Sequence, residues 1–243
     1  MINLNLVLAL VYPLIAGICI PIGGLFASAS HLNQNWLDLE IRHFIIALGA
    51  GILLGAVTLV LVPEGNAVMG YLGWTPAIVL LGGIVFFFLE KMIGHKRRNS
   101  PQVMGMLLDF IPESVALGSL IASGSDNVLL LALLIAFQNL PEGFNSYSEL
   151  ICANKCSAKK TIRYMFYLAL LGPVSGLMGF YVLADLPFFT GILMLFSSGG
   201  ILYLIFQDIA PQIPLKNHWL PSVGAVVGYV IGLTSLNLLG DTG

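Results

Sequence analysis

Apolar residues run through this chain in eight long, nearly uninterrupted stretches that are separated by short polar connectors. A helix needs about 20 mostly apolar residues to cross the roughly 30 Å hydrocarbon core of a bilayer, and each stretch is about that long. We therefore expect an all-α polytopic membrane protein in which residues 1–243 form a single eight-span domain. The predicted transmembrane helices lie near residues 3–26, 42–64, 72–93, 102–123, 127–148, 162–184, 188–209 and 219–239.

Two other interpretations of the apolar stretches fit less well. Strands of a transmembrane barrel alternate between apolar and polar residues, whereas these stretches are apolar throughout. The first stretch begins at Asn3 without a basic segment or a convincing cleavage site, so we expect a retained span rather than a signal peptide.

The basic residues predict how the chain lies in the membrane. All ten Lys and Arg residues fall in or beside odd-numbered connectors: Arg42 at the first, Lys91, Lys96, Arg97 and Arg98 at the third, Lys155, Lys159, Lys160 and Arg163 at the fifth, and Lys216 at the seventh. Basic connectors stay in the cytoplasm. We expect a multi-pass protein of the cell membrane with both termini outside the cytoplasm.

Composition narrows the class of protein further. Hydrophobic residues make up 58% of the chain and charged residues only 9%, against about a quarter charged in soluble domains. The net charge of −2 provides no basic surface for nucleic acid. His-Glu-x-x-His, Gly-x-Ser-x-Gly and Walker-type sequences are missing, so an intramembrane enzyme or an ATP-driven machine is disfavoured and no cofactor is expected.

Two predicted spans share a six-residue pattern, polar-x-x-Pro-Glu-small, in which x is any residue. The second copy lies 29 residues after the first. In the fourth span the pattern contains Asp109 and Glu113, and in the fifth it contains Gln138 and Glu142. Residues four apart lie on the same face of a helix. Each proline also frees a backbone carbonyl of the preceding turn as a further oxygen ligand. The pattern predicts two oxygen-rich stripes inside the membrane.

The carboxylates of Asp109, Glu113 and Glu142 lie at similar depth, and no Lys or Arg lies inside a span to neutralise them. Such groups are costly in a bilayer and call for a cation. Protons could serve, because burial favours the neutral carboxyl group, but a divalent metal matches oxygen donors more completely. Hydrogen bonding between helices or a proton path is the alternative; the duplication of the motif favours the metal.

Two more acidic residues and an internal similarity extend the picture. Asp208 lies near the cytoplasmic end of the seventh span, whereas Glu64 at the outer end of the second span is explained as an interfacial group in water. In the second span a Gly-Ile-Leu sequence that begins at Gly51 precedes Pro63. In the seventh span the same Gly-Ile-Leu sequence, beginning at Gly200, precedes Pro211. We expect an inverted repeat of spans 1–3 and 6–8 around spans 4 and 5, with chance similarity as the alternative.

The chain resembles the ZIP (Zrt/Irt-like protein) family of divalent metal transporters. The resemblance rests on eight spans, outside termini, Gly49-Ala50-Gly51 in the second span and both Pro-Glu helices. The fifth span, Gln-Asn-Leu-Pro-Glu-Gly at residues 138–143, fits the family pattern completely. The fourth departs from it, with Asp109 at the histidine position, Phe110 at the asparagine position and Ser114 at the glycine position.

The resemblance implies two metal positions, one formed by Asp109, Glu113, Gln138 and Glu142, and one by Glu113, Asn139, Glu142 and Asp208. The four histidines (His31, His43, His95 and His218) do not lie deep in any span, so imidazole is missing from the expected path. Oxygen ligands alone favour manganese, and allow ferrous iron, over the zinc usual for the family.

The leading hypothesis is a divalent metal transporter of the Zn/Mn/Fe type that moves metal into the cytoplasm, the metal being substrate rather than cofactor. Its expected partners are divalent metal cations and the lipid bilayer, with a homodimer as an option. The first alternative is a proton-coupled carrier of a small solute that uses Glu113 and Glu142 as relays. The second is a transport-inactive family member with an altered fourth span.

Overall fold

Eight helical segments long and apolar enough to cross a membrane make up this computed structural model, which describes residues 4–32, 39–70, 73–94, 101–154, 157–183, 185–214, 216 and 219–240. Spans 1 to 4 are α1 (Leu4–Leu32), α2 (Leu39–Gly55) continued by η1 (Ala56–Leu61) and α3 (Val62–Val68), α4 (Thr75–Gly94), and α5 (Pro101–Ser123). Spans 5 to 8 are α6 (Val128–Asn154), α7 (Ala158–Ala169) with α8 (Leu171–Val182), α9 (Pro187–Leu204) continued by η3 (Ile205–Ile209) and η4 (Ala210–Gln212), and α10 (Leu220–Gly240). The predicted all-α, eight-span fold is confirmed.

Several helices extend beyond their predicted limits. The second span reaches Val68, the sixth begins at Ala158, and the seventh reaches Gln212. Hydropathy marks only the part of a helix that matches hydrocarbon, whereas backbone hydrogen bonding continues into the polar residues on either side. The additional turns carry polar groups such as Lys159 and Gln212 to the ends of the bundle.

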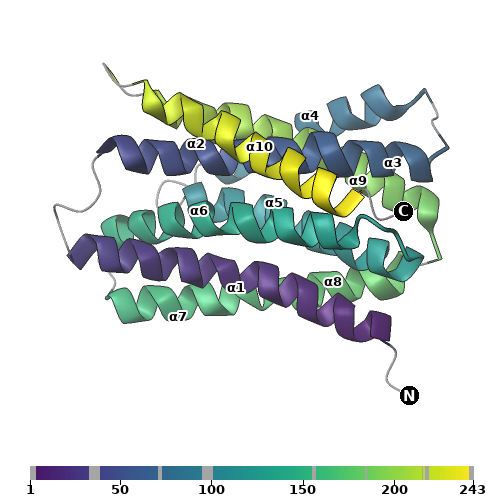
Figure 1. Ribbon diagram of the computed structural model, residues 1–243, viewed down its shortest axis with the longest axis horizontal. Coiled ribbons are helices and arrows are strands. Elements are labelled where there is room, and N and C mark those ends of the chain that lie inside the picture. The colour runs from purple at the N-terminus through teal and green to yellow at the C-terminus, as the bar shows by residue number, and fades with distance from the viewer. Residues whose placement is uncertain are drawn as a thin grey trace.

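The helices form two layers (Figure 1). In the first, which we call the motif layer, α1 packs on α6 and α8, and α5 packs on α6 and α8. In the second, which we call the flanking layer, α2 packs on α10, and α9 packs on α3 and α4. The layers meet where α2 contacts α6 and where α5 contacts α9. The two Pro-Glu helices therefore both belong to the motif layer and both border the flanking layer.

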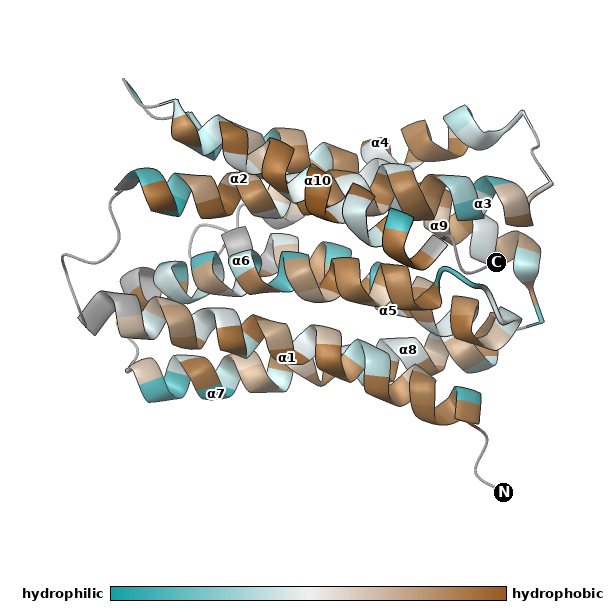
Figure 2. Cartoon of the chain, in the orientation of Figure 1, coloured by the Kyte–Doolittle hydropathy of each residue, from teal (hydrophilic) through white to brown (hydrophobic). Residues whose placement is uncertain are grey.

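The outer surface of the bundle is apolar. Figure 2 shows hydrophobic residues along the middle of the helices and hydrophilic residues concentrated towards their ends. Large side chains such as Leu80 and Phe88 of α4 and Val226 of α10 are exposed. Water would make such a surface unfavourable, but hydrocarbon solvates it. The predicted bilayer is therefore the environment that fits this surface.

Helix direction alternates, so α1 begins and α10 ends at the same end of the bundle, which we call the termini end (Figure 1). At the opposite end, the basic end, lie the described Lys and Arg residues: Arg42, Lys91, Lys159, Lys160, Arg163 and Lys216. The other four, Lys96, Arg97, Arg98 and Lys155, lie outside the described residues. Which end faces the cytoplasm stays a prediction.

Helix pairing follows the predicted inverted repeat. Exchanging span 1 with 6, 2 with 7, 3 with 8 and 4 with 5 converts the α2–α10 contact into α9–α4, α1–α6 into α8–α5, and α2–α6 into α9–α5. Spans 2 and 7 also both contain a π-helical turn, at Ala56–Leu61 and Ile205–Ile209, shortly before Pro63 and Pro211. Such turns occur often at functional sites. Spans 2 and 7 run in opposite directions, as an inverted repeat requires.

Candidate metal site

The two Pro-Glu helices hold their polar residues in the middle of the bundle. Of the helix windows that could span a membrane, that of α5 is 67% buried, against 11% for α4 and 17% for α10. Both α5 and α6 remain α-helical through Pro112 and Pro141. The prolines therefore do not break either helix, and the polar residues keep the four-residue spacing that places them on one face.

Glu113 and Gln138 form a direct link between the two helices. Both side chains are fully buried, and the Gln138 amide donates a hydrogen bond of 2.5 Å from Nε2 to Oε2 of Glu113. The bond joins residues expected at one metal position and orients both. It leaves Oε1 of Glu113 and Oε1 of Gln138 buried without a hydrogen-bond partner.

Asn139 and Phe110 both face α1. Nδ2 of Asn139 donates a hydrogen bond of 2.8 Å to the carbonyl of Ala16, while its Oδ1 is buried without a partner. The ring of Phe110 is fully buried and packs so closely against α1 and α8 that a Cβ atom on Gly17 or Gly172 would lie 3.0 or 2.7 Å from its Cζ. Phe110 is therefore a packing residue, and it offers no ligand atom at the position where the resemblance implied an asparagine.

Asp109, Glu142 and Asp208 line one cavity of about 290 Å³ between the layers. Asp109 lies within the first half of α5, which begins at the basic end, and Asp208 lies in η3, close to where span 7 finishes at that same end. The cavity therefore extends from the middle of the bundle towards the basic end. Oδ1 of Asp109 accepts a 2.7 Å hydrogen bond from the amide N–H of Phe110, which fixes the carboxylate.

When ionised, the three carboxylates of the motif repel one another: Glu142 and Glu113 act on Asp109, and Glu113 acts on Glu142. Neither α5 nor α6 contains a Lys or Arg residue that could offset this repulsion. A cation between the helices would relieve it, since buried charges in proteins are paired or bind metals.

Several buried oxygens of the two Pro-Glu motifs have no hydrogen-bond partner. They are Oε1 of Glu113, Oε1 of Gln138, Oδ1 of Asn139, and both Oε1 and Oε2 of Glu142. Nearly all buried polar atoms in proteins have a hydrogen-bond partner, so this concentration needs an explanation. Carboxylate and amide oxygens are ligands for hard divalent cations. In the described part of the chain, no three His, Cys, Asp or Glu side chains are arranged as a finished metal site. The amide oxygens and a shift of side chains would have to complete the coordination.

The structure adds three residues that the sequence analysis did not propose as metal ligands. Met106, Gln207 and Gln212 line the cavity with Asp109, Glu142 and Asp208. Gln212 lies four residues after Asp208, and its Nε2 donates a hydrogen bond to the backbone carbonyl of Asp208. The same four-residue spacing that identified the Pro-Glu motifs could have indicated Gln212. Met106, by contrast, looks like any apolar helix residue.

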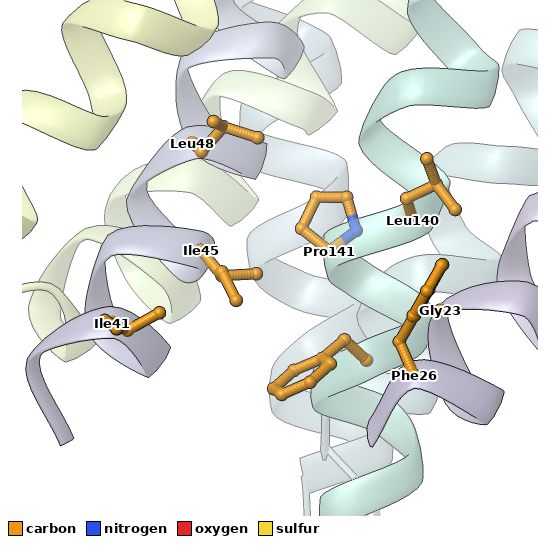
Figure 3. A pocket seen from close by; sticks show the side chains of 8 residues that line it. Gly23, Phe26, Ile41, Ile45, Leu48, Leu140 and Pro141 are labelled. Carbon is orange, nitrogen blue, oxygen red and sulfur yellow. The ribbon is translucent and has the colours of Figure 1, made fainter. Parts of the chain in front are cut away.

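A second, apolar cavity of about 430 Å³ lies behind the Pro-Glu motif of α6 (Figure 3). Pro141 and Leu140 of α6 line it together with Ile45 and Leu48 of α2, and Pro141 points towards α2. Its lining contains no charged residue, so it offers a metal ion no ligands. Neighbouring residues of one helix therefore line different spaces, Pro141 the apolar one and Glu142 the acidic one.

The comparison with known families decides the classification. The model of the ZIP zinc transporter family matches residues 101–239, more than half of the chain and all of spans 4 to 8. The chain belongs to the ZIP family. A search among curated proteins found no match.

Membership of the ZIP family assigns the chain to divalent metal transport across a membrane, not to enzymatic catalysis. The matched region contains both Pro-Glu helices and the span that carries Asp208. Spans 1 to 3 lie outside the match, but their packing mirrors that of spans 6 to 8. The structure therefore extends the repeat to the part of this ZIP chain that the family match leaves out.

Proposed function

We propose that this ZIP protein carries a divalent metal cation across the membrane into the cytoplasm through a site between spans 4 and 5. The proposed ligands are Asp109, Glu113, Gln138, Asn139, Glu142 and Asp208. The observation that supports this proposal is the set of five buried, unpartnered oxygens on Glu113, Gln138, Asn139 and Glu142. Cations bound at the two expected positions would provide partners for these oxygens, whereas an apolar packing role would provide none.

The ligand set favours a hard ion. No imidazole contributes to the proposed site: His43 is in the first turns of α2, and the side chains of His31, His95 and His218 lie outside what the structure describes. Oxygen donors suit manganese and ferrous iron better than they suit zinc, relative to sites with nitrogen or sulfur ligands. We therefore propose that discrimination in favour of zinc is weaker in this protein than in relatives with a histidine on span 4.

The cavity that contains Asp109, Glu142 and Asp208 provides the route to the basic end. Together with the tendency of basic connectors to stay in the cytoplasm, it supports release of the metal on that side. Asp208 would be the last carboxylate that the ion meets.

Uptake of a panel of divalent metals into cells or proteoliposomes tests the function. Saturable uptake that Glu113→Ala and Glu142→Ala each abolish, with both variants folded and inserted, is the expected result. Asp126→Ala, which changes an exposed carboxylate between α5 and α6, is the matched control and should transport normally. Saturable uptake that survives in both glutamate variants would place the path elsewhere. Failure of every metal with a folded native protein would indicate a transport-inactive member.

A further inference from the structure

A group of polar side chains joins the two layers at the termini end, opposite the acidic cavity. Glu64 of α3 belongs to the flanking layer, while Ser125 and Asn127 lie in the connector between α5 and α6 of the motif layer. Oε1 of Glu64 accepts hydrogen bonds from Oγ of Ser125, at 3.2 Å, and from Nδ2 of Asn127. Oγ of Ser125 also accepts a 3.2 Å bond from the backbone N–H of Asn127. The connector is thus fixed by one carboxylate of the other layer.

A second polar bond joins the layers on the same side. The buried hydroxyls of Ser119 on α5 and Thr190 on α9 lie 2.7 Å apart. Ser119 lies in the last turns of α5 and Thr190 in the first turn of α9, so both are in the half of the bundle near the termini end. The layers are therefore joined by polar bonds near the termini end and separated by the acidic cavity near the basic end.

The inverted repeat relates these two places. Spans 2 and 7 exchange under the repeat, and each has a π-helical turn that is followed by a proline. An acidic residue lies close to each proline, Glu64 in span 2 and Asp208 in span 7. Asp208 lines the open cavity, whereas Glu64 is held by hydrogen bonds. In transporters built from inverted repeats, access alternates as one part of the fold moves against the other around a fixed site.

We propose that Glu64, Ser125 and Asn127 form a clasp that keeps the termini end closed, and that this clasp must open before a metal ion can reach the motif glutamates from that side. The inference rests on the proposed transport function, because only a protein with alternating access needs such a closure. A hydrogen bond to a carboxylate is stronger than one between neutral groups, so a single glutamate can hold the connector and still release it.

A buried serine offers a reporter for opening. Ser197 of α9 is 1% exposed and lies seven residues after Thr190, which places both on the face of the helix that meets α5. In a chain without Cys19, Cys152 and Cys156, Ser197→Cys can be labelled by a membrane-impermeant thiol reagent only when the layers part.

The experiment compares labelling rates with the reagent applied on the side from which an exposed Gly73→Cys reacts. Glu64→Ala and Asn127→Ala should each raise the labelling rate of Ser197→Cys about tenfold or more, the change expected from losing a hydrogen bond to a charged group. Asp126→Ala removes an exposed carboxylate from the same connector and should leave the rate unchanged. Equal rates in all variants would overturn the clasp.

A disulfide provides the second test. A Glu64→Cys, Asn127→Cys pair, oxidised in the same background, should stop metal uptake until a reducing agent is added. Uptake that continues with the disulfide formed would show that the layers do not part there. Labelling needs no transport, so a chain that carries no metal can still show the clasp. The converse result is that the native protein takes up metal while Glu64→Ala and Asn127→Ala leave the labelling rate of Ser197→Cys unchanged. That result would contradict the clasp without contradicting the proposed transport function.

Discussion

Substituting Glu142 by methionine separates a residue that binds a cation from one that stabilises the fold. Both carboxylate oxygens of Glu142 are buried without a partner, so Glu142→Met removes two unsatisfied atoms and breaks no hydrogen bond. An unsatisfied buried polar group costs about 1–3 kcal/mol, and methionine is unbranched and adaptable. We expect the metal-free variant to be more stable than the native chain by about 1–3 kcal/mol. For a chain of this size that corresponds to about 2–4 °C in Tm per kcal/mol.

Glu113→Met is the matched comparison. Glu113 accepts the hydrogen bond of Gln138, so its replacement leaves a buried amide without an acceptor. That loss offsets the gain from removing the carboxylate, and we expect a smaller increase in stability, or a decrease, for Glu113→Met. The difference between the variants measures the Gln138 contact rather than burial in general, because the two glutamates occupy equivalent positions in their Pro-Glu motifs.

Thermal unfolding of the purified protein, with and without Mn²⁺ or Zn²⁺, gives the measurement. At a metal concentration of 100 Kd the native chain should gain about 2.7 kcal/mol, and Glu142→Met should lose this gain. A Glu142→Met protein that unfolds at a lower temperature without metal, yet is stabilised by metal as much as the native chain, would refute the reasoning. The Glu142 carboxylate would then be a structural group with partners of its own.

Three further predictions concern packing, selectivity and topology. A Cβ at Gly143 would lie 2.1 Å from a carbonyl oxygen of α1, so Gly143→Ala should lower Tm, whereas Gly55→Ala, with 3.7 Å to its nearest neighbour, should not. Asp109→His should shift competitive uptake towards zinc and away from manganese, because nitrogen suits zinc; an unchanged ratio would remove Asp109 from the coordination sphere. Ser157→Cys should react with impermeant reagents from the cytoplasm alone and Gly73→Cys from outside alone; the opposite pattern would invert the topology.

The sequence alone was sufficient to predict the number of spans and to single out the polar residues of the two Pro-Glu helices. Hydropathy is a property of consecutive residues, and in a bilayer a continuous apolar stretch has few stable forms other than a helix. The four-residue spacing of Asp109 and Glu113, and of Gln138 and Glu142, places each pair on one helix face whatever the neighbours are. The repeat between spans 2 and 7 was visible for the same reason, since it rests on local sequence.

Tertiary structure decided which atoms of those residues are free to bind. The four-residue spacing does not reveal that Gln138 donates to Glu113, or that Asn139 turns its amide towards Ala16, 123 residues away. The clearest difference is Glu64, expected as an interfacial group in water and found half-buried, bonded to groups 61 and 63 residues further along. A side chain's partners depend on helices that meet only when the bundle packs, and the apolar pattern that specifies each span carries no information about which spans become neighbours.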